Sequence, residues 1–112
     1  GNVFVLTNGL TFSAASLFCN TVKGQKNVTL VGEETGGGWY GNSGIIIPDI
    51  TLPNTKLRVR LPMFKLVQYH HVAFKGTGVI PDVNVPPTVK NVRNKTDLKM
   101  KVVKDLISAK SK

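Results

Sequence analysis

The sequence is poor in cysteine, with Cys19 alone, and in aromatic residues, which make up 7% of its 112 residues. A single cysteine excludes an intrachain disulfide framework, and its apolar surroundings predict that Cys19 packs in a core. No apolar run reaches the roughly eighteen residues of a membrane span, so we expect no transmembrane segment. Charged residues reach only 19%, and 41% are apolar, which excludes a coiled coil and predicts one domain with a modest core.

Acidic residues are scarce too, six against fifteen Lys and Arg, which gives a net charge of +9. The excess is uneven, because eight of the fifteen basic residues follow position 89, where only Asp97 and Asp105 oppose them. No aromatic residue follows Phe74, and no RNA-binding motif accompanies the charge, so we expect no nucleic-acid partner. The run predicts the solvated face of a helix; binding to an anionic surface stays an alternative.

The first third of the chain has the pattern of a strand, a helix and a second strand. Residues 3–6 and 28–31 are short apolar runs, each followed by a turn, as is typical of buried strands. Between them, apolar residues recur at helical spacing, with Thr11 or Ser13 as the predicted N-cap and Gly24 as the stop. Such a unit predicts parallel strands whose carboxyl ends share one edge of a sheet.

The middle of the chain is predicted to be extended. Glycine-rich residues 36–44 lead into residues 45–52 and 57–61, which flank a Pro-Asn-Thr turn. Apolar and charged residues alternate there, so we expect a β-hairpin with one buried face. Residues 63–74 continue in an extended form.

A helix is predicted at the end of the chain, capped by Asn94 or Thr96. Its lysines lie opposite an apolar stripe, which favours docking onto its own domain over lying on a membrane. The stripe consists of Leu98, Val102, Val103, Leu106 and Ile107. We therefore divide the chain into a body, residues 1–89, and a basic amphipathic helix, residues 90–112.

The glycines at 36, 38 and 41 match the spacing of a dinucleotide-binding fingerprint. That fingerprint needs a following helix to hold the pyrophosphate, whereas residues 42–47 are strand-like, so we reject nucleotide binding. A loop that another backbone or a peptide approaches closely explains the glycines better.

Ser13 is the candidate nucleophile, because it starts a helix directly after a buried strand. There its hydroxyl would lie beside helix N–H groups that can stabilise an oxyanion. The Gly-x-Ser-x-Gly spacing is absent, and an ordinary N-cap is the competing interpretation. His70 and His71 are the only histidines, and in a strand they face opposite ways, so at most one could act as a base. They are poor metal ligands as neighbours, and we expect no metal or cofactor.

Three ordered segments carry a family resemblance: residues 5–16, 31–37 and 76–82. They resemble the tail-specific (C-terminal processing) serine peptidases, which include the tricorn-like proteases, over about residues 3–85. The resemblance implies an α/β fold with a crotonase-like βαβ core, to which this chain adds a β-hairpin and a C-terminal helix. It also implies a peptide or protein substrate and an extracytoplasmic location, periplasmic or secreted.

By this resemblance Ser13 is the catalytic nucleophile and the Ala14 N–H an oxyanion-hole donor. The loop residues Gly36, Gly37 and Gly38 become candidates for contact with substrate. Gly38 stands where the tail-specific enzymes have their activating lysine, and Lys75 where the tricorn-like enzymes have a glutamate.

The missing activators predict that the general base lies outside these residues. Because the sequence opens directly on a core strand, we expect the C-terminal portion of a larger peptidase domain. Alone it would be inactive, and it would self-associate or pair with the missing N-terminal part. The alternative is a catalytically inactive, peptidase-like module that binds peptides.

Overall fold

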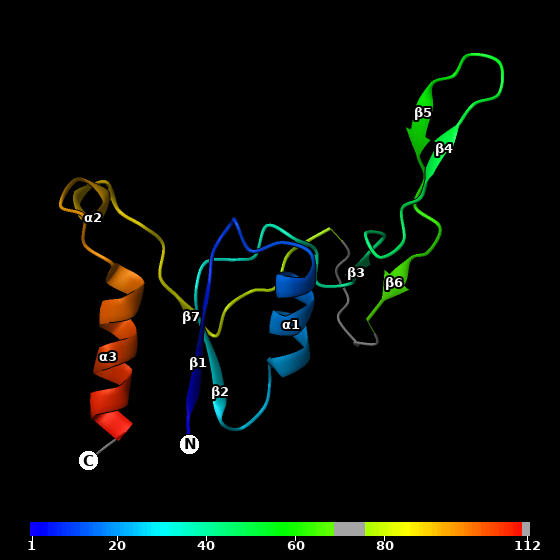
Figure 1. Ribbon diagram of the computed structural model, residues 1–112. Helices are drawn as coiled ribbons and strands as arrows, with labels where there is room; N and C mark the ends of the chain where they lie inside the picture. The colour runs from blue at the N-terminus through cyan, green and yellow to red at the C-terminus, as the bar shows by residue number, and fades with distance from the viewer. Residues whose placement is uncertain (69–75, 111–112) are drawn as a thin grey trace.

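A computed structural model describes residues 1–68 and 76–110 of the chain. Within these ranges a strand, a helix and a second strand come first, only strands follow as far as β7, and two helices come last (Figure 1). They are β1 (Val3–Thr7), α1 (Ala14–Val22), β2 (Val28–Gly32), β3 (Gly41–Asn42), β4 (Asp49–Thr51), β5 (Arg58–Arg60), β6 (Leu66–Val67), β7 (Val83–Asn84), α2 (Val89–Arg93) and α3 (Leu98–Lys110).

A three-stranded parallel sheet in the order β1-β2-β7 forms the centre of the molecule. Val3 pairs with Val28 at one end of β1, and Thr7 pairs with Gly32 at the other. The predicted parallel βαβ unit is therefore confirmed. Since both strands run the same way, the segments that follow Thr7 and Gly32 leave the sheet at one edge.

Helices cover both faces of this sheet (Figure 1). Successive side chains of a strand face opposite ways, and in β2 Leu30 packs in the cluster with Cys19 of α1, while Val31 packs with Val103 of α3. Leu30 and Val31 are both fully buried. Cys19 is in the core as predicted, and burial raises the pKa of its thiol.

The helices confirm part of the predicted boundaries. α1 begins after Ser13, and the chain turns away at Gly24, whose φ of 86° suits glycine. α3 begins one residue after Asp97, whose carboxylate accepts the Met100 N–H at 2.9 Å. The predicted caps Asn94 and Thr96 are wrong, because an acidic side chain both accepts this hydrogen bond and favours the positive helix end.

The short helix α2 was not predicted, since five residues are too few for a periodic pattern. Thr88 caps it by accepting the Asn91 N–H at 3.2 Å. α3 docks on the sheet through its apolar stripe, as predicted, with Val103 buried and Ile107 48% exposed at its outer end. None of the described helices is both long and apolar enough to cross a membrane.

β4 and β5 form the predicted antiparallel hairpin, but the prediction that one of its faces is buried is wrong. Every residue of both strands is exposed. The hairpin projects away from the sheet (Figure 1), and the molecule measures 68 × 36 × 25 Å along its principal axes. Apolar and charged residues do alternate along the hairpin, but no described element packs against its apolar side.

Asp82 is hydrogen-bonded to the edge of β2 that faces away from β1. Its carboxylate accepts the Leu30 N–H at 2.8 Å and pairs with Lys23 at 2.6 Å, just past the end of α1. Burial by itself would raise the pKa of Asp82, but the hydrogen bonds from Lys23 and Leu30 and the Lys23 charge outweigh it and lower the pKa below 3.8. A carboxylate thus extends the sheet and anchors the helix.

Because its pKa is lowered in the folded state, Asp82 contributes stability that is present above the pKa of the unfolded chain and is lost as the pH falls through the folded value. Asp82→Asn should lower the free energy of unfolding by about 1 kcal/mol at pH 7, and the difference from wild type should shrink toward pH 2. Urea titrations between pH 2 and 7 measure this. The exposed Asp105→Asn is the matched control, and an equal effect of the two variants would contradict the assignment.

Candidate active site

Ser13 lies at the edge where β1 leads into α1, and its backbone is strained. It has φ 52° and ψ −125°, a region that residues other than glycine rarely adopt, at a cost of about 1–3 kcal/mol. It occupies the N-cap position, yet its side chain forms no capping hydrogen bond. The capping role is thus not realised, and the exposed hydroxyl has no hydrogen bond with any described residue.

The turn at Ser13 is held by the Thr11 carbonyl oxygen. It accepts the Ser16 hydroxyl at 2.8 Å and the Gly37 N–H at 3.0 Å. Ser16 is 1% exposed, so the first of these bonds is shielded from water. One oxygen thereby joins the turn, the first turn of α1 and the loop after β2.

Two of the three predicted loop glycines lie against the serine turn. A Cβ on Gly36 would stand 2.2 Å from the Gly9 carbonyl oxygen, and one on Gly37 would stand 2.4 Å from Ser16 Oγ. Gly38 lies farther along, where it forms an isolated bridge with Gly78. The backbones at 36 and 37 can approach the serine turn this closely only because they carry no side chain.

Thr35 is a buried residue whose hydroxyl stabilises this loop through two hydrogen bonds. It is 3% exposed, and its hydroxyl donates to the Gly37 carbonyl oxygen at 2.8 Å while accepting the Val79 N–H at 2.7 Å. The Glu34 carboxylate accepts the Gly78 N–H at 2.7 Å in the same way. The third resemblance segment is therefore a brace for the loop that contacts the serine turn.

Ala14 provides the first N–H of α1. No described residue accepts a hydrogen bond from it, and Ala14 is exposed. The first N–H groups of a helix carry its positive partial charge, which favours an anion beside them. Among the described residues, no acceptor competes with an oxyanion for the N–H next to Ser13.

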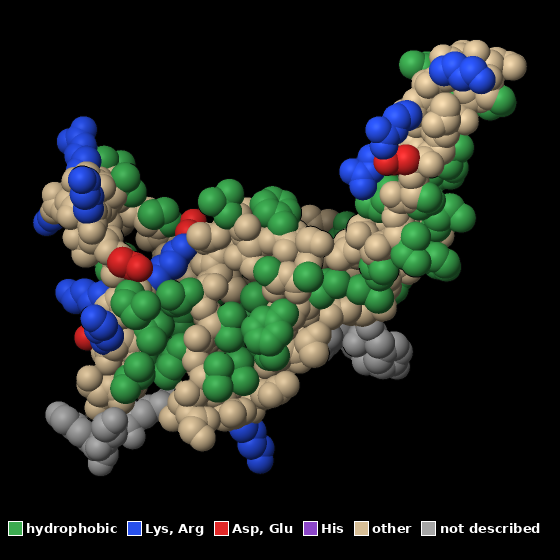
Figure 2. Space-filling model, viewed as in Figure 1, with side chains coloured by type: hydrophobic (Ala, Val, Ile, Leu, Met, Phe, Trp, Pro, Cys, Tyr) green, Lys and Arg blue, Asp and Glu red, His purple; other side chains and the backbone are tan. Residues whose placement is uncertain are grey.

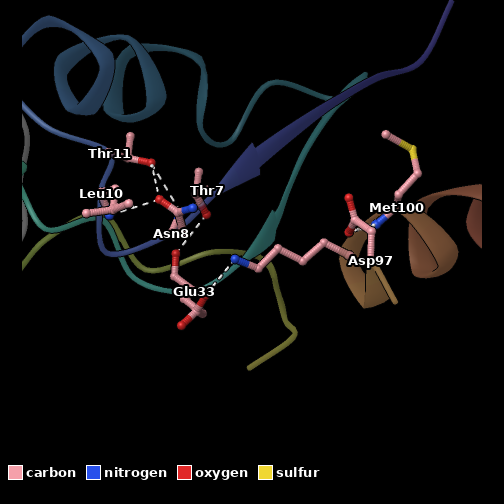
Figure 3. A network of polar contacts seen from close by, with 8 residues as sticks. Thr7, Asn8, Leu10, Thr11, Glu33, Asp97 and Met100 are labelled. Atoms are coloured by element: carbon pink, nitrogen blue, oxygen red, sulfur yellow. Dashed lines mark hydrogen bonds and ion pairs between the residues drawn. The ribbon is translucent and has the colours of Figure 1, made fainter. Parts of the chain in front are cut away.

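A polar network secures the segment that precedes Ser13 (Figure 3). The Asn8 N–H donates to Thr11 Oγ1 at 3.1 Å, and the Thr7 hydroxyl donates to the Glu33 carbonyl oxygen at 2.8 Å. Lys99 of α3 pairs with the Glu33 carboxylate at 2.5 Å, and its side chain is only 19% exposed. The C-terminal helix is in this way bonded to the strand ends beside the site.

Large apolar side chains flank Ser13 without closing over it. Leu10 is 85% exposed and Phe12 54%. Among the hollows of the described residues are one of about 360 Å³ beside Asn8 and Leu98 and one of about 130 Å³ beside Trp39, and Ser13 lines neither of these. The exposed serine thus has exposed apolar neighbours.

The two histidines considered as a base, and the lysine at the position of the tricorn-like glutamate, lie outside the described residues. His70, His71 and Lys75 belong to residues 69–75, which are not among the described residues. Sequence reasoning missed Ser16 and Thr35 as supports of the site. Their only signal was a small polar residue among apolar and glycine neighbours at the start of a helix or the end of a strand.

An exposed serine on a strained turn from strand to helix has the geometry of the nucleophile elbow of α/β-hydrolases. A family model of peptidase family S41 matches residues 1–85. The chain therefore belongs to peptidase family S41, a family of serine peptidases, in agreement with the resemblance to tail-specific enzymes. No curated protein matches the chain.

Replacing Ser13 separates backbone strain from chemistry. Glycine tolerates the positive φ at this position, whereas alanine is strained there. Glycine also loses more conformational entropy on folding, which offsets part of this advantage. Ser13→Gly should therefore be more stable than Ser13→Ala by a net difference of about 1 kcal/mol. Thermal or urea unfolding of the two variants measures the difference. Equal stabilities would mean that the turn is not strained.

Gly37→Ala should destabilise the fold by about 1–3 kcal/mol, because its Cβ would collide with Ser16 Oγ and press on the Phe12 and Ser13 backbone. Gly9→Ala is the matched control in the same region, since its Cβ would meet nothing within 4 Å. We expect the control to change stability by less than about 0.5 kcal/mol in urea unfolding. Two similar losses would refute the close approach at position 37.

Proposed function

We propose that the chain carries the nucleophile of a serine-type endopeptidase of the tail-specific kind, built on a crotonase-like core. The observation that carries the proposal is the strained backbone of Ser13, with its exposed and unbonded hydroxyl beside a helix start. Strain of this kind gathers at functional sites, because it is retained only where the surrounding contacts enforce it. An ordinary capping serine would not need it.

In the proposed reaction, Ser13 Oγ attacks the carbonyl carbon of the scissile peptide bond while a base removes its proton. The carbonyl oxygen becomes an oxyanion, which the Ala14 N–H stabilises by about 3 kcal/mol, the typical loss on removing one such donor. Collapse of the tetrahedral intermediate expels the amine, which takes up the proton, and leaves an ester on Ser13. Water then hydrolyses this acyl-enzyme.

The base is proposed to come from outside the 112 residues. Gly38 occupies the position of the lysine in the tail-specific enzymes and has no side chain to offer. No described residue forms a hydrogen bond with Ser13 Oγ. Since general-base help is worth about 10²–10⁴ in rate, the chain alone should be almost inactive.

The substrate is proposed to be an extended peptide, taken up near a protein C-terminus in a periplasmic or secreted setting. Leu10 and Phe12 give it an apolar surface beside Ser13, and Gly36 lies exposed next to them. An open surface of this kind suits a flexible chain end, which can reach the serine without a deep cleft.

A second candidate is an inactive module that keeps the fold and binds peptides. The glycine that stands, by the resemblance, at the position of the activating lysine favours it. The two candidates differ in whether the Ser13 hydroxyl reacts.

Fluorophosphonate labelling, with imidazole added as an external base, tests the proposal. Wild type should label slowly, the rate should rise with imidazole concentration, and mass spectrometry should place the adduct on Ser13. Ser13→Ala should not label, whereas the exposed Ser43→Ala should behave as wild type. A double variant, His70→Ala with His71→Ala, should leave the rate unchanged if the base lies elsewhere.

Rapid labelling without imidazole that vanishes in the histidine variant would place the base within the chain. Failure of Ser13 to label at any imidazole concentration, together with binding of an unstructured peptide, would replace the peptidase with the binding module. Peptide hydrolysis by wild type and Ser13→Ala at equal rates would exclude Ser13 as the nucleophile.

A further inference from the structure

One face of the β4–β5 hairpin is entirely apolar. Ile50 lies directly opposite Val59, and the register continues toward the base, where the Met63 N–H donates to the Ile46 carbonyl oxygen at 3.0 Å. Alternate residues of both strands therefore share one face. We term this set the apolar hairpin face; it consists of Ile46, Pro48, Ile50, Leu52, Leu57, Val59, Leu61 and Met63.

The apolar hairpin face is open to solvent along its whole length (Figure 2). Pro48 is exposed, and the other seven side chains are 39% to 62% exposed. Within residues 1–68 and 76–110, nothing packs over it. A two-stranded hairpin is at best marginally stable in water, so we expect another protein surface to pack against an apolar face of this length.

The charged residues of the hairpin restrict the kinds of partner that could pack on its apolar face. Asp49 pairs with Arg58 and Arg60 on the opposite face, so these groups are already partnered and point away from the apolar side. A charged partner would find nothing to bind on the apolar face. The tip, residues 53–56, is polar and ends in Lys56, which does not suit insertion into a bilayer.

The size of the face fits a protein interface. Eight half-exposed apolar side chains amount to several hundred Å², the range that marks interaction sites, and a standard interface uses about 800 Å² from each partner. A flat apolar face is complementary to a copy of itself across a two-fold axis. Two hairpins packed face to face, about 10 Å apart, would bury the face completely.

The charged side chains of the hairpin lie outside the faces that would pack, because Asp49, Arg58 and Arg60 are on the opposite face and Lys56 is at the tip. Of the net charge of +9, residues 90–112 carry +6, in the segment that forms α2 and α3 on the far side of the sheet from the hairpin (Figure 1), and the hairpin, residues 46–63, carries +2. Screening reduces interactions beyond about 8–10 Å at physiological salt, and the molecule is 68 Å long. The geometry points to a homodimer in which the apolar hairpin faces of two copies pack against each other.

Analytical ultracentrifugation of the 112-residue chain tests the dimer. Wild type should sediment as a dimer in the micromolar range, and Ile50→Glu should raise the dissociation constant about tenfold or more, because it places a charge at the centre of the face. Thr51→Glu is the matched control on the opposite face, beside Arg58, and should leave the constant within about twofold. Fluorescence of Trp39, which is 6% exposed, should be unchanged in both variants and so report an intact core.

Cross-linking provides a second measurement that needs no charge in the hairpin. Cys19 is 2% exposed, so an introduced cysteine is the reactive thiol among the described residues. A bis-maleimide that spans about 10 Å should join two copies of Ile50→Cys and not of Thr51→Cys. Wild type that stays monomeric at every concentration of a 100-fold dilution series, up to its solubility limit, would overturn the proposal. So would a dimer indifferent to Ile50→Glu, or a monomer that uses the face to bind anionic phospholipid vesicles.

Discussion

The Thr11 carbonyl oxygen is the point on which the site depends, because it accepts hydrogen bonds from both Ser16 and Gly37. One partner comes from the first turn of α1 and the other from the loop after β2. Together they hold a backbone at Ser13 that costs about 1–3 kcal/mol by itself. Ser16 itself is buried, which limits the access of water to its hydroxyl. The strained turn persists because distant segments enforce it.

The parallel sheet makes that convergence of segments inevitable. β1 and β2 end at the same edge, so the serine turn and the glycine loop must leave the sheet side by side. Helices on both faces bury Leu30 and Val31 and fix the sheet, and the Lys99–Glu33 pair joins α3 to the strand ends. The chain belongs to peptidase family S41, and the proposed nucleophile Ser13 lies at this edge. The fold thus places a helix N-terminus next to the exposed Ser13 hydroxyl.

The molecule divides into a well-covered sheet and an uncovered hairpin. The sheet has a core on each face, whereas every residue of β4 and β5 is exposed. Both parts follow the same rule, that apolar residues alternate or recur so as to share a face. In the sheet the partner face belongs to the same chain. In the hairpin it is proposed to belong to a second copy, which would keep the apolar side dry and leave the Ser13 surface free.

The sequence by itself determined the parallel βαβ unit, the place of Ser13 at the start of α1, the core position of Cys19 and the apolar stripe of α3. The separate elements follow from residues within one or two turns of each other, where period and capping chemistry decide, and the parallel pairing follows from the order strand, helix, strand. Only the tertiary structure decided that Ser13 has a positive φ, that Gly37 and not Gly38 lies against it, and that the hairpin is uncovered. Backbone strain and burial depend on contacts between segments far apart in the chain. A local sequence pattern does not show which of those segments come into contact.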